Sequence, residues 1–331
     1  MRTIAEQVGV NVSTVSRALR TDRAANLGGV SGEVAERIRA VAGELGYRPD
    51  PYAASLTTRR IHAIGVLVPQ LTDIVAATFY QGIDECATKH GYQTLVANTH
   101  DDRQERSERV ELMLSRRVDG LILGDTNIDG SSLRELRLAE SYPVILVNRR
   151  AEGYVSATGD DVAGGRLVGE HLAELGHRHV GIIAGPSWAS PGVDRSRGCR
   201  EALAEHGILI PSEYVVHSTF DAEGGREAGG QLLDRVPRPT AIFAVNDYAA
   251  IGVMGIARTH GLQVGEDLAI IGYNDISIAR DVPVPLTSVI NPLNAMGRAA
   301  TELLLDVLSG KTVHSVKLKP SLAIRESSKG L

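Results

Sequence analysis

The sequence predicts two structurally different regions, a small all-α head and a larger α/β body built on parallel sheets. Residues 1–46 carry apolar side chains at helical spacing and contain no strand-like run. From Ile61 onward, short apolar runs such as IGVLVP, GLILG and AIFAVN alternate with amphipathic stretches. This alternation is typical of parallel sheets with crossover helices. The length after Ile61 suits two α/β lobes better than one.

The composition favours a cytoplasmic protein with aliphatic cores. Hydrophobic residues make up 43% of the chain but aromatic residues only 4%, so the cores should consist of Val, Ile, Leu and Ala. The chain has no apolar run of about 18 residues, the length of a membrane span, and no apolar segment typical of a secretory signal at its start. Cys86 and Cys199 stand apart from ligand-spaced histidines, which favours two reduced core thiols over a disulfide or a metal site.

Positive charge is concentrated at the start of the chain. Residues 1–60 hold nine arginines and six acidic residues, a formal charge of +3, whereas the whole chain carries −5. A basic head on an acidic body favours a polyanionic partner for the head. An ordinary solvated surface accounts for the same charges, so the charge distribution alone does not decide whether the head binds a polyanion.

The head is expected to contain three helices. Gly9 and Gly46 should end the first and the third, while Asn11 and Ser31 should cap the second and the third at their N-termini. The apolar positions predict the inner faces. These positions are Ala5 and Val8 in the first helix, Val15, Ala18 and Leu19 in the second, and Val34, Ile38, Val41 and Leu45 in the third.

Two short helices joined through a glycine-containing turn on a basic head fit a helix-turn-helix. Small residues at the start of the second helix let the backbone approach DNA closely. Ser13, Thr14 and Ser16 can donate to phosphates or base edges, and Arg17 can reach a guanine or a phosphate. A plain capped helix in a small bundle fits the same spacing, so the residues alone leave both interpretations open.

The stretch AEQVGVNVSTVSRAL resembles the head of the LacI/GalR family of bacterial transcription regulators, whose pattern runs VAxxAGVSxxTVSRxLN. The resemblance continues through VSGEVAERIRAVAGELGYRPDPYAASL, GHRHVGIIAGP, AVNDYAAIGV, IIGYND and the terminal IRESS. It covers essentially the whole chain, with several independent motifs in the same order. It implies a helix-turn-helix DNA-binding domain over 1–46, in which Val12, Ser13 and Arg17 set base preference.

The resemblance also implies a hinge over 47–60. In this family the segment corresponding to PYAASL becomes helical on operator DNA, and a pair of these helices enters the minor groove. A leucine from each helix opens the central base step, and Leu56 occupies this place, with Ala53 on the same helix. The segment is too short to hold a helix alone, which fits folding on DNA. A flexible linker is the alternative.

The body is expected to resemble periplasmic sugar-binding proteins, with two lobes, three crossovers and a small molecule between the lobes. The expected lobes are 61–160 with 291–320 and 161–290 with 321–331. Loops at the carboxyl ends of the strands carry the ligand contacts in such sheets. The motifs assign effector contacts to Asp73, Phe79 and Asn148 in the first lobe and to Arg195, Phe220, Asn246 and Asn274 in the second.

The chemistry of these residues predicts recognition of a polyol. Amides both donate to and accept from neighbouring hydroxyls, and Arg195 supplies a fork of donors. Phe220 offers a face to a sugar ring or a base, although an isolated Phe is also a common core residue. Asn246 or Asp247 can instead cap the following helix. Trp188 can stack on a ligand or pack on its own neighbours.

Several positions depart from the family pattern. Thr3 stands where an acid is common. Asp50 stands where Asn is frequent and Ala54 where Arg is frequent, and these two changes should weaken non-specific attraction to phosphates. Asn274 stands where an Asp is common, so that a fixed charge becomes an amide. The usual NPFF after the first strand is replaced by DIVA, which brings Asp73. The effector therefore need not be that of a familiar member.

Together these observations predict a homodimeric, ligand-responsive repressor that binds a pseudo-palindromic DNA operator, controlled by a sugar or sugar derivative. A purine or nucleoside effector is the alternative. A solute-binding protein and a sugar- or nucleotide-acting enzyme are the competing classes. The chain shows no GxSxG, P-loop or GxGxxG spacing, so no catalytic residue, cofactor or metal is expected. The end at IRESSKGL carries no heptads, so a tetramer built on a C-terminal coiled coil is not expected.

Overall fold

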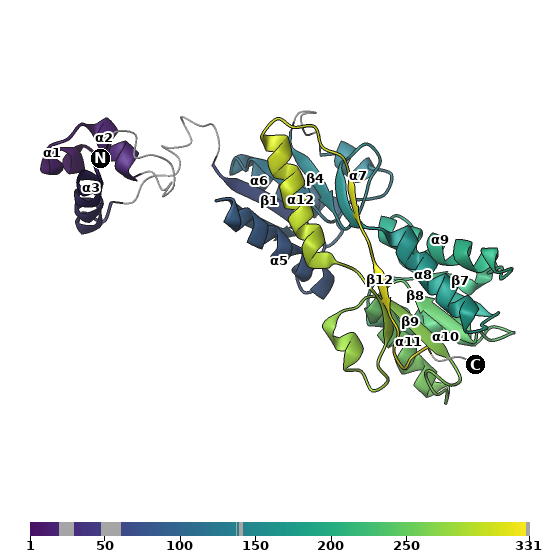
Figure 1. The fold of residues 1–331 in the computed structure, drawn as a ribbon. Coiled ribbons are helices and arrows are strands. Elements are labelled where there is room, and N and C mark those ends of the chain that lie inside the picture. Colours follow the sequence, from purple (N-terminus) through teal and green to yellow (C-terminus); the bar gives the residue numbers. More distant parts are fainter. Residues whose placement is uncertain (20–29, 48–60, 137, 139–141, 329–331) are drawn as a thin grey trace. The chain divides into compact units, whose positions relative to one another are not determined.

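The computed structural model describes residues 1–19, 30–47, 61–136, 138 and 142–328 (Figure 1). The chain divides into two compact units, Met1–Ile61 and His62–Leu331. The first unit is the predicted all-α head and the second is the predicted α/β body. The predicted hinge residues Ala53 and Leu56 lie outside the described residues.

The head contains three helices around a small core. Gly9 ends α1 with a left-handed backbone, φ 74°, a conformation that glycine adopts without penalty. The Asn11 Oδ1 accepts the Ser13 amide at 3.0 Å, and the Ser31 Oγ accepts the Val34 amide at 3.4 Å. These caps satisfy amide groups that a helix start leaves unpaired. The helices are α1 (Arg2–Val8), α2 (Val12–Leu19) and α3 (Gly32–Glu44).

The predicted inner face of α3 is wrong at one of its four positions. Ile38 is fully buried, and Val34 and Val41 are partly buried and pack against the head core. Leu45 was predicted to face inward but is 46% exposed. It is the C-cap residue that follows Glu44, so the helical spacing no longer places it on the inner face. Ala35 and Ala42 complete the buried face.

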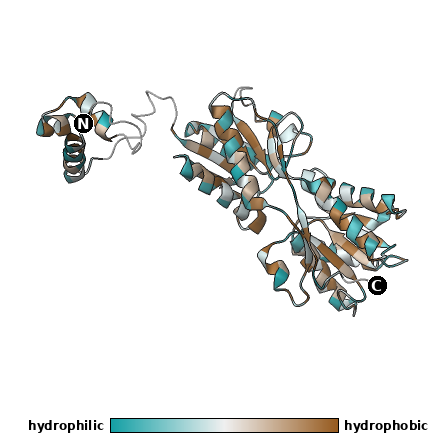
Figure 2. Ribbon diagram, viewed as in Figure 1, coloured by the Kyte–Doolittle hydropathy of each residue, from teal (hydrophilic) through white to brown (hydrophobic). Residues whose placement is uncertain are grey.

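The body is built on two six-stranded sheets, one in each lobe, and the strands are rich in hydrophobic residues (Figure 2). Adjacent strands pair in parallel, except that β10 and β12 are antiparallel. The first sheet has the order β11-β5-β4-β3-β1-β2 and the second β12-β10-β9-β8-β6-β7. The strands of the first are β1 (Ala63–Val68), β2 (Gln93–Asn98), β3 (Gly120–Leu123), β4 (Val144–Val147), β5 (Ser156–Gly159) and β11 (Val316–Leu318). Those of the second are β6 (Val180–Ala184), β7 (Val215–His217), β8 (Ala241–Ala244), β9 (Ala269–Asn274), β10 (Thr287–Ile290) and β12 (Ser321–Ala323).

The chain passes between the lobes three times, after β5, after β10 and between β11 and β12. This confirms the predicted architecture of two parallel-sheet lobes with three crossovers. The helices of the first lobe are α5 (Ile74–Lys89), α6 (Arg103–Ser115), α7 (Ser131–Arg134) and α12 (Leu293–Leu308). Those of the second are α8 (Asp161–Glu174), α9 (Ser190–Glu205), α10 (Ala222–Leu233) and α11 (Asp247–Thr259).

Close packing of α8 against α9 positions the inner part of the second lobe. A side chain at Gly165 would collide with the backbone oxygen of Arg195, and one at Gly198 with that of Val162. Glycine at both positions lets the two helix backbones approach one another. Asp161 on α8 and Arg195 on α9 are thereby held side by side. No helix in the described part of the chain has both the length and the apolar character needed to cross a membrane.

Candidate functional site

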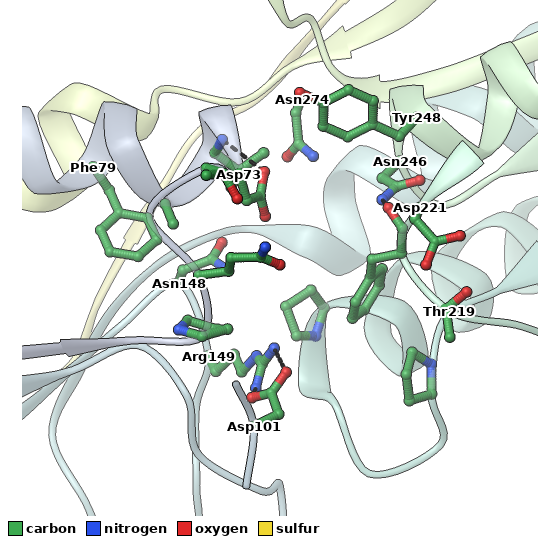
Figure 3. A pocket seen from close by; sticks show the side chains of 18 of the residues that line it. Asp73, Phe79, Asp101, Asn148, Arg149, Thr219, Asp221, Asn246, Tyr248 and Asn274 are labelled. Carbon is green, nitrogen blue, oxygen red and sulfur yellow. Dashed lines mark hydrogen bonds and ion pairs between the residues drawn. The ribbon is translucent and has the colours of Figure 1, made fainter. Parts of the chain in front are cut away.

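A cavity of about 440 Å³ lies between the two lobes of the body (Figure 3). Asp73 and Asn148 lie on the first-lobe side, while Asn246 and Asn274 belong to the second lobe. Most of the lining residues come from loops at the carboxyl ends of the parallel strands, where ligand sites of such sheets lie. The lining includes all seven residues selected from the sequence, which are Asp73, Phe79, Asn148, Arg195, Phe220, Asn246 and Asn274.

Asp73 combines a structural contact with exposure to the cavity. Its Oδ1 accepts the Val75 amide at 3.0 Å and so caps α5. Burial raises the pKa of its carboxyl, and the Val75 hydrogen bond and the Arg149 charge partly offset this rise. The carboxylate therefore stands in a partly desolvated place, where an added hydrogen-bond donor stabilises its charged form.

Asn148 and Asn274 both have left-handed backbones, with φ 63° and 105°. The Asn148 Oδ1 is buried without a hydrogen-bond partner. The Asn274 Oδ1 accepts from the Asn291 Nδ2 at 3.1 Å. Buried amide oxygens are rarely left unpaired, because the cost is about 1–3 kcal/mol. Asn148 thus presents an acceptor that a bound molecule can satisfy.

Arg195 is buried and held by its own lobe. Its Nε donates to the Asp161 Oδ1 at 2.7 Å and its Nη1 to the Val245 oxygen at 2.8 Å. The guanidinium lies 3.8 Å from the centre of the Tyr273 ring. Burial opposes the charged form, but Asp161, Tyr273 and Asp247 together more than offset this, and the pKa of Arg195 is raised. The side chain is therefore a fixed cation in the cavity wall.

Asn246 caps α11, as one of the alternatives from the sequence anticipated. Its Oδ1 accepts the Ala249 amide at 2.9 Å, and its Nδ2 donates to the Phe220 oxygen at 2.5 Å. Phe220 is partly buried and its ring lies against the backbone of Gly185. Phe79 is only 1% exposed and belongs to the first-lobe core. Phe79 borders the cavity from within that core.

The start of α2 presents small polar side chains to solvent. Val12, Ser13 and Arg17 are exposed, while Thr14 and Ser16 are partly exposed. The Arg17 Nε donates to the Ser13 oxygen at 3.3 Å. This leaves the face of α2 opposite Val15 and Ala18 lined by hydroxyl groups and one guanidinium.

Family models match both the helical head and the α/β body. Residues 1–50 match the model of bacterial regulatory proteins of the lacI family, and residues 170–328 match the periplasmic binding protein-like domain. The ribose operon repressor of Escherichia coli (strain K12) is 31% identical over 96% of this chain and 96% of its own length. The chain belongs to the LacI family.

Two solved structures support this LacI-family assignment. The lac repressor dimer bound to operator and the anti-inducer ONPF has a TM-score of 0.87 and 26% identity, covering 98% of both chains. The CelR–cellobiose complex has a TM-score of 0.74 and 30% identity, also covering 98% of both chains. This LacI-family protein is therefore a DNA-binding, ligand-responsive transcriptional regulator and not an enzyme.

Several residues that line the cavity between the lobes were not selected from the sequence. These are chiefly Asp101, Arg149, Asp221 and Tyr248. Asp101 follows β2 and Arg149 follows β4, so the rule that found Asn148 also applied to them. Their pairing was not predictable, because loops far apart in the sequence meet only in the folded sheet.

Trp188 belongs to a set of contacts between the lobes. Its backbone oxygen accepts the Ile128 amide at 2.9 Å, and its ring lies under the Arg149 guanidinium, 5.0 Å from the ring centre. Beside it, the Arg150 Nε donates to the Asp194 Oδ2 at 2.7 Å, and the Nη2 donates to the Asp194 Oδ1 at 2.8 Å. Trp188 also lines the cavity. Its position is therefore compatible with both alternatives from the sequence, packing on its own neighbours and stacking on a ligand.

Proposed function

We propose that a small hydroxyl-rich molecule binds in the cavity between the lobes and controls operator binding by this repressor. The observation that carries the proposal is the convergence of seven residues, chosen from separate motifs, on one cavity of about 440 Å³. That volume is appropriate for a small ligand. The unpaired Asn148 Oδ1 adds an acceptor that a hydroxyl group satisfies.

Each polar side chain has a role in this proposal. Asn148 accepts a hydroxyl, and Asp73 accepts one through the carboxylate oxygen that does not cap α5. Arg195 donates through N–H groups not engaged by Asp161 and Val245, because a guanidinium has five donors. Asn274 and Asn246 orient the ligand from the second lobe. The Phe220 ring supplies an apolar face for a sugar ring.

The proposed DNA contacts lie on the head. We infer that α2 enters the major groove, where Val12, Ser13 and Arg17 approach base edges, and Thr14 and Ser16 contact phosphates. Ala53 and Leu56 are proposed to contact the minor groove at the centre of the operator. A dimer then places two recognition helices in successive major grooves of a pseudo-palindromic site.

Effector binding and operator binding must affect each other equally in free energy. A sugar that favours one lobe arrangement therefore shifts operator affinity, and operator DNA shifts sugar affinity by the same factor. Loss of operator affinity on binding means induction, and gain means corepression.

Thermal unfolding against a panel of sugars and nucleosides tests the effector class. A ligand at about 100 times its dissociation constant stabilises the folded state by roughly 2.7 kcal/mol. Stabilisation by a sugar, reduced to about 1.4 kcal/mol in Asn148→Gly by a tenfold loss of affinity, is the expected result. Stabilisation by nucleosides alone contradicts the sugar assignment and makes Phe220 a base-stacking face.

Variants of the head test the DNA contacts separately. Arg17→Ala and Leu56→Ala are expected to abolish operator binding and leave effector binding intact. Arg235→Ala, an arginine of the body, serves as the control for Arg17→Ala. Full operator affinity in Arg17→Ala or Leu56→Ala contradicts the assigned contact.

A further inference from the structure

The positive charges of the cavity wall are already neutralised by the chain itself. Among the lining residues, all of which lie in the described part of the chain, only Arg149 and Arg195 are cationic. Both are buried, with 4% and 3% exposure. The two terminal nitrogens of Arg149 donate to the two carboxylate oxygens of Asp101, at 2.5 and 3.0 Å. Arg195 is paired with Asp161 at 2.7 Å, so neither guanidinium offers an uncompensated charge.

Helix N-termini are the other common anion sites in α/β proteins. Three helices, α5, α10 and α11, begin beside the cavity, and each is capped by a lining side chain. The caps are Asp73 to the Val75 amide at 3.0 Å, Asp221 to the Gly224 amide at 2.8 Å and Asn246 to the Ala249 amide at 2.9 Å. Helix α9 also begins there and has no side-chain cap, but its second residue, Pro191, has no amide hydrogen to offer an anion.

The charges that remain in the wall are negative. Asp73 and Asp221 line the cavity, and no ion pair to either is present among the described residues. Asp73 is partly buried, and its surroundings disfavour its charge. A further anion in the cavity would add repulsion to this unfavourable desolvation without gaining a free cation.

We propose that the cavity selects an uncharged or cationic hydroxyl-rich effector and rejects phosphate esters of the same compound. This inference deepens the proposed effector site and rests on it. A carboxylate such as Asp73 accepts a hydroxyl or ammonium donor in a charge-assisted hydrogen bond. A phosphate meets the same carboxylate as a like charge, while Asp101 and Asp161 already neutralise the charges of the two arginines.

Matched pairs of ligands test the selection on the full-length protein. The probes are D-ribose with D-ribose 5-phosphate, cellobiose with its 6′-phosphate, and potassium phosphate with potassium chloride at equal ionic strength. Any parent sugar that shifts the unfolding midpoint is expected to bind at least about 30-fold more tightly than its phosphate ester. This ratio corresponds to the repulsion between two like charges about 8 Å apart at an effective dielectric constant near 20. A phosphate ester that binds as tightly as its parent overturns the proposal.

Releasing a cavity arginine provides an independent test that needs no known sugar. Asp101→Asn frees the Arg149 guanidinium, and this variant is expected to be stabilised by potassium phosphate, whereas the parent protein is not. Asp306→Asn removes a carboxylate from an exposed ion pair with Lys311 and is the control. Phosphate binding by the parent protein, or no gain in Asp101→Asn, overturns the charge argument.

A second variant covers the case in which Asp101→Asn fails to fold. Asp73→Asn retains a side-chain acceptor for the Val75 amide and removes the partly buried negative charge that has no ion pair in the described part of the wall. In this variant the ratio of the affinity for a parent sugar to that for its phosphate ester is expected to fall several-fold. An unchanged ratio contradicts the proposal. If no sugar of the panel binds, the sugar assignment fails, and the phosphate comparison with Asp101→Asn still decides the charge argument.

Discussion

The two walls of the cavity differ in how firmly their polar side chains are held. In the second lobe, Arg195 and Asn246 each make two hydrogen bonds to groups of the same lobe. In the first lobe Arg149 is fixed by Asp101, but Asn148 has an unpaired buried oxygen and Asp73 uses a single oxygen to cap α5. The second wall is thus organised before a ligand arrives, and the first keeps acceptors that a ligand completes. The comparison predicts that variants of the second wall lose stability and variants of the first lose ligand affinity.

The largest expected effect is that of Arg195→Ala. Removing the guanidinium leaves the Asp161 carboxylate buried without its cation, which costs about 3–5 kcal/mol of unfolding free energy. Chemical denaturation measures this loss. Arg166→Ala removes a partly exposed arginine paired with Glu205 at 2.6 Å, and it should leave the denaturation midpoint nearly unchanged. Equal midpoints for the two variants contradict the organised second wall.

Asn148→Gly is expected to have the opposite profile. Asn148 has a left-handed backbone that glycine adopts freely, so the unfolding free energy should change by less than about 1 kcal/mol. Effector affinity should fall about tenfold, because one hydrogen bond to the ligand is lost. Isothermal titration and denaturation of the same preparation separate the two quantities. A strongly destabilised variant with normal affinity reverses the assignment.

The ion pair between the lobes, Arg150 with Asp194, gives a smaller effect. The Arg150 side chain is 37% exposed, and a double-mutant cycle with Arg150→Ala and Asp194→Ala should give a coupling of about 0.5–1 kcal/mol. Effector affinity should fall a few-fold in either variant, since the contact favours approach of the first lobe to the second. Unchanged affinity in both variants shows that the contact is unrelated to closure.

The smallest effect is a pH dependence confined to the second lobe. Burial lowers the pKa of His171, which accepts from or donates to the Ser328 hydroxyl at 2.9 Å. The unfolded chain therefore takes up a proton at a higher pH than the folded chain. Stability that His171 confers is complete above pH 6.5, the ordinary value, and is lost as the pH falls through the lowered value.

Comparing the unfolding free energy of the parent protein with that of His171→Gln isolates the contribution of His171. Asp247, whose pKa burial raises to about 7, favours the folded state at low pH in both proteins, so its slope cancels in the difference. The difference in unfolding free energy between the two proteins should shrink as the pH falls below 6.5. A difference that is constant from pH 8 to pH 5 contradicts the assignment of His171.

The sequence predicted the architecture because strand and helix patterns are local, and the individual cavity residues followed from the motifs that the chain shares with the LacI family. Strand ends mark the positions of Asp73, Asn148 and Asn246, and capping chemistry predicted the boundaries at Asn11 and Ser31. The pairings of Arg149 with Asp101 and of Arg195 with Asp161 were not predictable, since they depend on which loops and helices become neighbours in the folded lobes.

The error at Leu45 has a local cause. Helical spacing predicted four inner positions, but α3 ends at Glu44 and Leu45 is its C-cap residue. A hydrophobic pattern predicts that a helix exists more securely than it predicts the residue at which the helix ends.

Operator affinity measured against effector concentration, for the parent protein and Asn148→Gly, tests the central claim most directly. The claim is that the effector acts through the cavity and through the first-wall acceptors. The account predicts equal operator affinity without effector and a response in the variant that is displaced to about tenfold higher effector concentration. A variant that responds at the same concentration as the parent contradicts the claim.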